Sequence, residues 1–127
     1  MLHMFSTFQS ALLPILQSDI DGETERILRD VTDRQAKIND LTRQIDALDS
    51  EQETIFKDQE RVRRNLSELR QNPLESSLRQ RYIRQFESQE NRIEAIENER
   101  EKLESEQDVE LEQLETFIQK ISIDRKL

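Results

Sequence analysis

Residues 66–82 read LSELRQNPLESSLRQRY, and Pro73 within this stretch interrupts an otherwise helical pattern. A proline has no N–H and pushes the preceding residue away from helical angles, so we expect a first helix to end just before it. Two restarts are open: Asn72 can cap a helix whose first residue is Pro73, or Ser77 can cap a later one. The stretch predicts a turn over residues 72–77 between two helices.

Upstream of the turn, apolar residues recur in alternating steps of three and four, which is the spacing of a coiled coil. The pattern persists over seven heptads, although some positions are polar. Its members are Ile20, Thr24, Ile27, Val31, Arg34, Ile38, Leu41, Ile45, Leu48, Gln52, Ile55, Gln59, Val62, Leu66 and Leu69. A disordered segment has no reason to keep such a register, so we predict a first long helix over residues 19–71.

Downstream of the turn the same spacing returns and predicts a second long helix over residues 78–122, followed by a tail at 123–127. Its members are Tyr82, Phe86, Gln89, Ile93, Ile96, Arg100, Leu103 and Gln107. Beyond Gln107 the better stripe moves to Leu111, Leu114, Ile118 and Ile121. This is a four-residue stutter, which locally unwinds a supercoil.

Two long helices joined by a few residues must run antiparallel. In such a pair an a position faces a d position, and facing residues whose numbers sum to 148 satisfy this rule. Layers such as Val62 with Phe86 and Ile55 with Ile93 follow. The predicted fold class is therefore all-α, an antiparallel two-helix coiled-coil hairpin. Residues 1–18 contain no Asp, Glu, Lys or Arg, and their helical spacing of Phe5, Phe8 and Leu12 predicts a short amphipathic helical segment.

The composition supports an elongated structure. Apolar residues make up 33% of the 127 residues and charged residues 37%, against roughly 45–50% and about 25% in ordinary globular domains. Such a chain cannot fill a compact core, but it can bury a narrow stripe along two helices.

Several functional classes are disfavoured by what the sequence lacks. There is no Cys, so we expect no disulfide and no thiolate chemistry. No run approaches the roughly 18 apolar residues of a membrane span. A secretory signal pattern is also missing, which favours the cytoplasm without fixing the compartment. The net charge of −9 argues against non-specific binding of nucleic acid by the whole chain.

A second apolar stripe lies beside the seam, at the heptad e positions. It consists of Leu28, Phe56, Ile83, Leu111 and Ile118. These residues either widen the seam within one chain or form a docking face for a partner. We favour docking, because a two-helix seam with several polar layers is weakly stabilised and burial of the stripe adds to its stability. A homodimer, forming a four-helix arrangement, is the simplest form.

Positive charge gathers around the turn. Residues 61–84 contain seven arginines and two acids, a local charge of +5, whereas residues 1–60 and 85–127 each carry −7. The arginines are Arg61, Arg63, Arg64, Arg70, Arg79, Arg81 and Arg84. They either pair with nearby acids or bind an anionic surface.

Residues for catalysis, cofactor binding or metal binding do not form a recognisable pattern. His3 is the single histidine and has no Cys or second His to share a zinc ion. Glu97, Glu101, Glu104 and Asp108 share one helical face, but a straight helix does not offer converging ligands. We therefore expect no enzyme activity, no cofactor and no metal.

The residues around the turn carry a family resemblance. The run Gln59-Glu60-Arg61-Val62-Arg63-Arg64-Asn65-Leu66 and the pair Arg81-Tyr82 resemble the C-terminal coiled-coil hairpin of large bacterial proteins grouped with mucoidy inhibitors. The resemblance covers about residues 40–122. It implies a helical appendage of unknown biochemical function, either a fragment or a stand-alone relative, and supplies no catalytic residue.

The resulting expectation is a structural or protein-interaction module that self-associates or docks a partner along its e-position stripe. Two alternatives stay open. The basic turn could bind nucleic acid or acidic lipid, with nucleic acid the less expected. By analogy of fold, the hairpin could also be a stalk-like accessory of a secretion or motor assembly.

Overall fold

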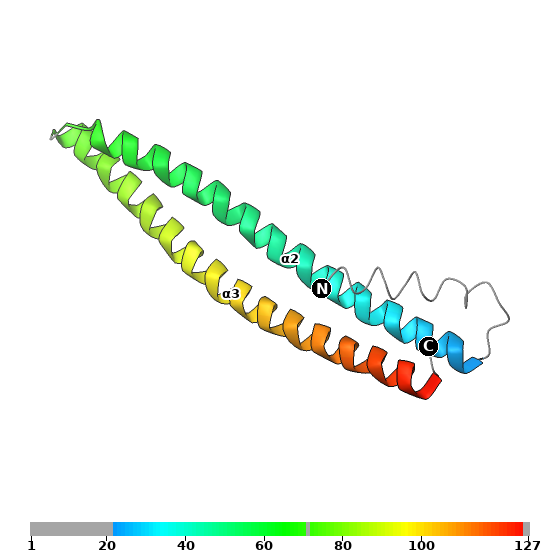
Figure 1. Cartoon of the computed structure of the whole chain (residues 1–127). Coiled ribbons are helices and arrows are strands. Elements are labelled where there is room, and N and C mark those ends of the chain that lie inside the picture. The colour runs from blue at the N-terminus through cyan, green and yellow to red at the C-terminus, as the bar shows by residue number, and fades with distance from the viewer. Residues whose placement is uncertain (1–21, 71, 126–127) are drawn as a thin grey trace. The chain divides into compact units, whose positions relative to one another are not determined.

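The computed structural model describes residues 22–70 and 72–125, which form two long helices that pack against each other as a helical hairpin (Figure 1). Helix α2 spans Gly22–Ser67 and helix α3 spans Pro73–Arg125. Within the described residues there is no β-strand. The predicted all-α hairpin is thereby confirmed. The predicted amphipathic segment over residues 1–18 lies outside the described residues.

The connection lies earlier in the chain than the predicted turn over residues 72–77, because α2 ends at Ser67 and α3 begins at Pro73 and not at residue 78. Of the two restarts, the Asn72 cap is the one that forms. Asn72 Oδ1 accepts a hydrogen bond from the Glu75 N–H at 2.9 Å, and Asn72 Nδ2 donates to Glu75 Oε2 at 2.5 Å. Pro73 is suited to the first helical position, since its fixed φ is already helical and its missing N–H would have no partner there.

Helix α2 ends at Ser67, four residues before the predicted end. Its last turn tightens, with Glu68 N–H bonded to Asn65 O and Leu69 N–H to Leu66 O, both at 3.3 Å. Such three-residue bonds are common where an α-helix terminates. At the other end of the hairpin α3 continues to Arg125, past the predicted end at residue 122, because no helix breaker follows Ile121.

The described chain divides into two units, each with its own core. Unit 1 comprises the described residues within 22–40 and 106–125, and unit 2 comprises 41–105. The buried residues of the unit 1 core are Val31, Ile38, Leu111, Leu114 and Ile121. Those of the unit 2 core are Leu41, Leu48, Ile96 and Leu103, with Ile45 and Ile55 packed against them.

The unit 1 core confirms the predicted stutter. Leu111 and Leu114 are both buried, and Ile118 packs against them. A strict heptad continued from Leu103 would have placed Leu111 beside the seam instead of in it. The shift of four residues brings Leu111 into the core.

Contacts between the helices also agree with the predicted pairing. In unit 2, Asn65 Nδ2 donates to Tyr82 OH and Arg79 Nη2 donates to Leu69 O, and the paired numbers sum to 147 and 148. In unit 1, Lys37 Nζ lies 3.5 Å from Glu110 Oε1, again a sum of 147. A slip of one heptad would change each sum by seven, so the register is the predicted one.

The seam should be sensitive to small losses of volume. Ile96 has no exposed surface, whereas Ile123 is 77% exposed. We expect Ile96→Val to lower the free energy of unfolding by about 1 kcal/mol, because it leaves a methyl-sized void. Ile123→Val should leave it unchanged. Urea unfolding followed by circular dichroism measures both, and equal effects would contradict the core assignment.

Candidate interaction surface

The two edges of the seam in unit 2 differ in chemistry, and this difference defines the candidate site. We call the surface of the heptad g positions the g edge; it includes Glu51, Asp58 and Asn65 of α2 and Gln85 and Arg92 of α3. The surface of the e positions is the e edge. It comprises Thr42, Asp49, Phe56 and Arg63 of α2 and Ile83, Glu90, Glu97 and Glu104 of α3.

The g edge is bridged by polar contacts between the helices. Asp58 Oδ2 accepts hydrogen bonds from Gln85 Nε2 at 3.0 Å and from Gln89 Nε2 at 2.6 Å. Further along, the Arg92 guanidinium donates two hydrogen bonds to the Glu51 carboxylate, at 2.6 and 2.8 Å. In each of these contacts the donor and the acceptor belong to the same chain. Few unpaired polar groups of the g edge are therefore left to bind a second molecule.

The carboxylates of the g edge are held in their charged form. Arg61 Nε donates to Asp58 Oδ1 at 2.8 Å and is the main cause of a lowered Asp58 pKa, with Gln89 and Gln85 adding to it. The hydrogen bond from Arg92 likewise lowers the pKa of Glu51. Both groups therefore favour the folded state when they are ionised.

Acid should weaken the hairpin through Asp58. Its pKa in the folded chain lies below the unfolded value of about 3.9, so its stabilising effect is complete above that pH and is lost as pH falls through the lowered pKa. We expect Asp58→Asn to lower the thermal midpoint at pH 6 and to lose most of this difference near pH 2. Asp46→Asn, at an exposed carboxylate, is the control and should show no such pH-dependent difference.

Several polar residues in the seam of unit 2 are paired across it. Gln59 is 3% exposed and its Nε2 donates to Glu90 Oε1 at 2.8 Å. Arg100 Nη2 donates to Gln52 Oε1, and Arg100 Nε lies 2.7 Å from Asp49 Oδ1. These layers resemble the polar layers that fix register in coiled coils, since a slip would separate each pair.

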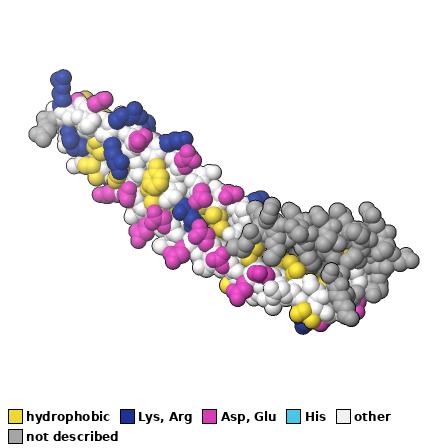
Figure 2. All heavy atoms as spheres, viewed as in Figure 1, with side chains coloured by type: hydrophobic (Ala, Val, Ile, Leu, Met, Phe, Trp, Pro, Cys, Tyr) yellow, Lys and Arg dark blue, Asp and Glu magenta, His cyan; other side chains and the backbone are white. Residues whose placement is uncertain are grey.

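The e edge keeps large apolar side chains at the surface. Phe56 is 48% exposed and Ile83 is 42% exposed. Beside Phe56 lies a shallow hollow, lined also by Glu53, Lys57, Gln59, Glu60, Arg63 and Glu90. In Figure 2, hydrophobic side chains reach the surface next to the group of Lys and Arg side chains at the loop end.

The predicted docking stripe is only partly an exposed surface. Leu111 is wrong as a docking residue, because the stutter brings it into the core of unit 1. Leu28 is half-buried, and Ile118 is half-buried against that same core. Phe56 and Ile83, both in unit 2, are the members that stay exposed, so the candidate surface is the e edge of unit 2.

The seven arginines around the loop divide into two groups. Three have partners: Arg61 with Asp58, Arg63 over the Phe86 ring at 5.2 Å, and Arg79 with the Leu69 carbonyl. The other four are exposed and form no ion pair with any described residue. They are Arg64, Arg70, Arg81 and Arg84.

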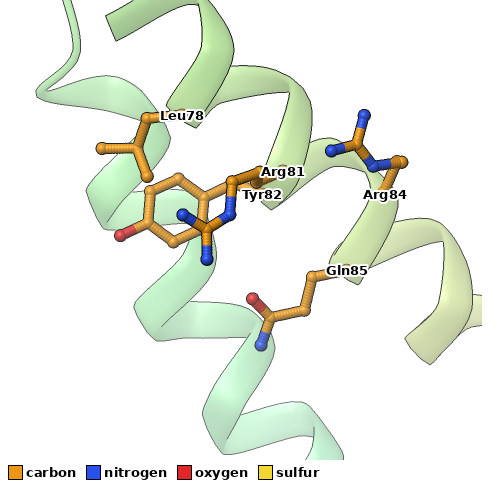
Figure 3. A pocket seen from close by; sticks show the side chains of 5 residues that line it. All are labelled: Leu78, Arg81, Tyr82, Arg84 and Gln85. Carbon is orange, nitrogen blue, oxygen red and sulfur yellow. The ribbon is translucent and has the colours of Figure 1, made fainter. Parts of the chain in front are cut away.

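Arg81 and Arg84 border a hollow at the start of α3, together with Leu78, Tyr82 and Gln85 (Figure 3). Figure 3 shows Tyr82 and Gln85 directed toward α2 and Arg84 directed away from it. The two guanidinium groups therefore do not converge on one point. The hollow lacks the enclosed, converging polar groups of a small-molecule site.

Other classes of site find no support in the described residues. No group of three or more Asp, Glu, His or Cys side chains is placed to share a metal ion within residues 22–70 and 72–125. The acidic face of α3, with Glu97, Glu101, Glu104 and Asp108, is exposed. Neither described helix is both long and apolar enough to cross a membrane. His3 lies outside the described residues.

The sequence analysis missed the polar pairs of the g edge. The signal was available, because the predicted pairing brings the g positions of the two helices close together and Glu51 and Arg92 have opposite charges. The central role of Asp58 was harder to foresee, since its partners come from a g position, a d position and its own helix.

Comparison with known proteins returned nothing: no family model, curated protein or solved structure matches the chain. The resemblance of residues 40–122 to the mucoidy-inhibitor hairpin stays a prediction.

Proposed function

We propose that this chain is a non-enzymatic helical hairpin that associates with a second copy of itself through the e edge of unit 2. The observation that carries the proposal is the exposure of Phe56 and Ile83 on one edge of a seam whose other edge is bridged by polar contacts. Burial of large apolar side chains is the main favourable contribution to protein association.

Charge supports a second copy as the partner. Within unit 2, the loop region of residues 61–84 carries +5, while the flanking segments 41–60 and 85–105 each carry −4. Two copies placed in opposite directions bring the basic region of each against the acidic region of the other. Complementary charge of this kind guides association and selects the partner, and two-fold pairs are the commonest oligomers.

The dimer should depend on Phe56. Full burial of such a side chain contributes about 1.5–3 kcal/mol. A two-fold dimer of the variant would lose this contribution twice, once for each copy. We expect Phe56→Ser to raise the dimer dissociation constant by at least about tenfold, measured by sedimentation equilibrium, with helix content unchanged by circular dichroism.

Val109 is a matched control, because it is 51% exposed but belongs to unit 1 and is not an e-edge residue. Val109→Ser should leave the dissociation constant unchanged. A wild-type chain that stays monomeric at high micromolar concentration would overturn the proposed self-association.

A second candidate function is contact between the loop and an anionic lipid surface. Leu74 is 83% exposed and belongs to segment 61–84, which also contains the four arginines that lack an ion pair among the described residues. An apolar side chain amid basic ones is typical of membrane-surface contact. Nucleic acid is less suited, since Tyr82 and Phe86 are both half-buried and Tyr82 accepts a hydrogen bond from Asn65.

Vesicles containing acidic lipid should test this candidate. Each arginine near such a surface contributes about 1 kcal/mol, so Arg81→Gln with Arg84→Gln should weaken binding roughly 30-fold at low salt. Lys102→Gln, at an exposed site in the acidic part of unit 2, should have little effect. Binding to an oligonucleotide but not to vesicles, or to neither, would rule the candidate out.

A further inference from the structure

The e edge carries an ordered series of charges and apolar side chains. The pairing in which facing residue numbers sum to about 148 sets Ile83 level with about residue 65 of α2 and Glu90 level with about residue 58. The Asn65–Tyr82 and Gln59–Glu90 contacts agree with this pairing to within one residue. From the loop outward, the order along the helices is therefore Ile83, Arg63, Glu90 and Phe56.

This series is complementary to its own reverse. It reads apolar, positive, negative, apolar, so that reversal places opposite charges together and apolar side chains together. The spacing also matches. About the midpoint between Arg63 and Glu90, these two lie roughly 4 Å away, and Ile83 and Phe56 roughly 7 Å, at 1.5 Å per residue.

We propose that two copies pair antiparallel about a two-fold axis at this midpoint. Phe56 of each copy packs on Ile83 of the other, and Arg63 faces Glu90. The inference rests on the proposed self-association and adds its direction and register. An axis that instead ran along the helices would place Arg63 against Arg63 and Glu90 against Glu90, and like charges disfavour such pairing.

The side chains that this arrangement needs are available. Phe56 and Ile83 are both exposed in the single chain. Glu90 is exposed and accepts one hydrogen bond, from Gln59, which leaves acceptor capacity on its carboxylate. Arg63 is exposed at the rim of the hollow beside Phe56.

That hollow has a natural occupant in the pair. It is bounded by Phe56, Arg63 and Glu90, and the two-fold axis brings Ile83 of the second copy to the level of Phe56. An aliphatic side chain entering there would contact the Phe56 ring. Arg63 and Glu90, at the rim of the same hollow, would meet Glu90 and Arg63 of the second copy.

The chain contains no cysteine, so engineered cysteines can report the register directly. Phe56→Cys and Ile83→Cys are expressed separately, mixed, and equilibrated in a glutathione redox buffer. We expect a disulfide-linked heterodimer in the mixture and no disulfide dimer of either variant alone. In the proposed pair, the two copies of residue 56 lie roughly 14 Å apart along the direction of the helices, beyond the reach of a disulfide.

The charges give an independent test. Arg63→Glu alone and Glu90→Arg alone should each raise the dissociation constant by about tenfold, since each creates two like-charge contacts per dimer. A mixture of the two variants should recover wild-type affinity as a heterodimer. Circular dichroism checks that each variant keeps its helix content.

The outcomes separate this inference from the proposed function. A disulfide dimer of Phe56→Cys alone overturns the antiparallel register but leaves self-association standing. The same conclusion follows if the wild type is a dimer but the mixed cysteine variants form no disulfide and the mixed charge variants do not recover wild-type affinity. A wild-type monomer overturns both.

Discussion

Reversal of the chain at Asn72 and Pro73 is the constraint on which the rest of the structure depends. Asn72 supplies a side-chain acceptor to Glu75 N–H, and the Glu75 carboxylate in turn accepts from the Arg70 N–H at 2.8 Å. The end of α2 and the start of α3 are therefore tied within a few residues. With so short a connection, the pairing of residues along unit 2 follows from the position of the loop.

The seam between the helices is not uniformly apolar, and its polar members add specificity to its packing. Gln59 reaches Glu90 and Arg100 reaches Gln52, both between helices. Apolar layers tolerate a shift of one heptad, because another apolar residue then takes each place. The polar pairs do not, since a shift would leave buried groups without partners. Packing thus stabilises the hairpin and the polar layers select its register.

The sequence was sufficient to predict the hairpin, the pairing and the stutter, because the spacing of apolar residues over many heptads determines all three. Helix ends were less predictable. Asn72 and Ser77 are both good caps, and the choice between them depends on contacts such as Glu75 with Arg70 that spacing does not reveal. The docking stripe was partly mispredicted for a related reason: Leu111 is an e residue by counting, but the stutter moves it into the core. The docking edge was the least predictable feature, because it depends on which e residues stay exposed, and the exposure of Phe56 and Ile83 and the burial of Leu111 follow from the packing.

The dependence of both edges on helical phase has a consequence for how such a chain can vary in length. One residue inserted into an α-helix turns everything beyond it by about 100°, which would carry Phe56 or Asp58 off its edge and into solvent or the seam. Lengthening of the helices would therefore be tolerated chiefly as whole heptads added to both. Extra residues between Ser67 and Pro73 would not change the phase of either helix, but they would separate the Arg70, Asn72 and Glu75 groups that tie the two helix ends together.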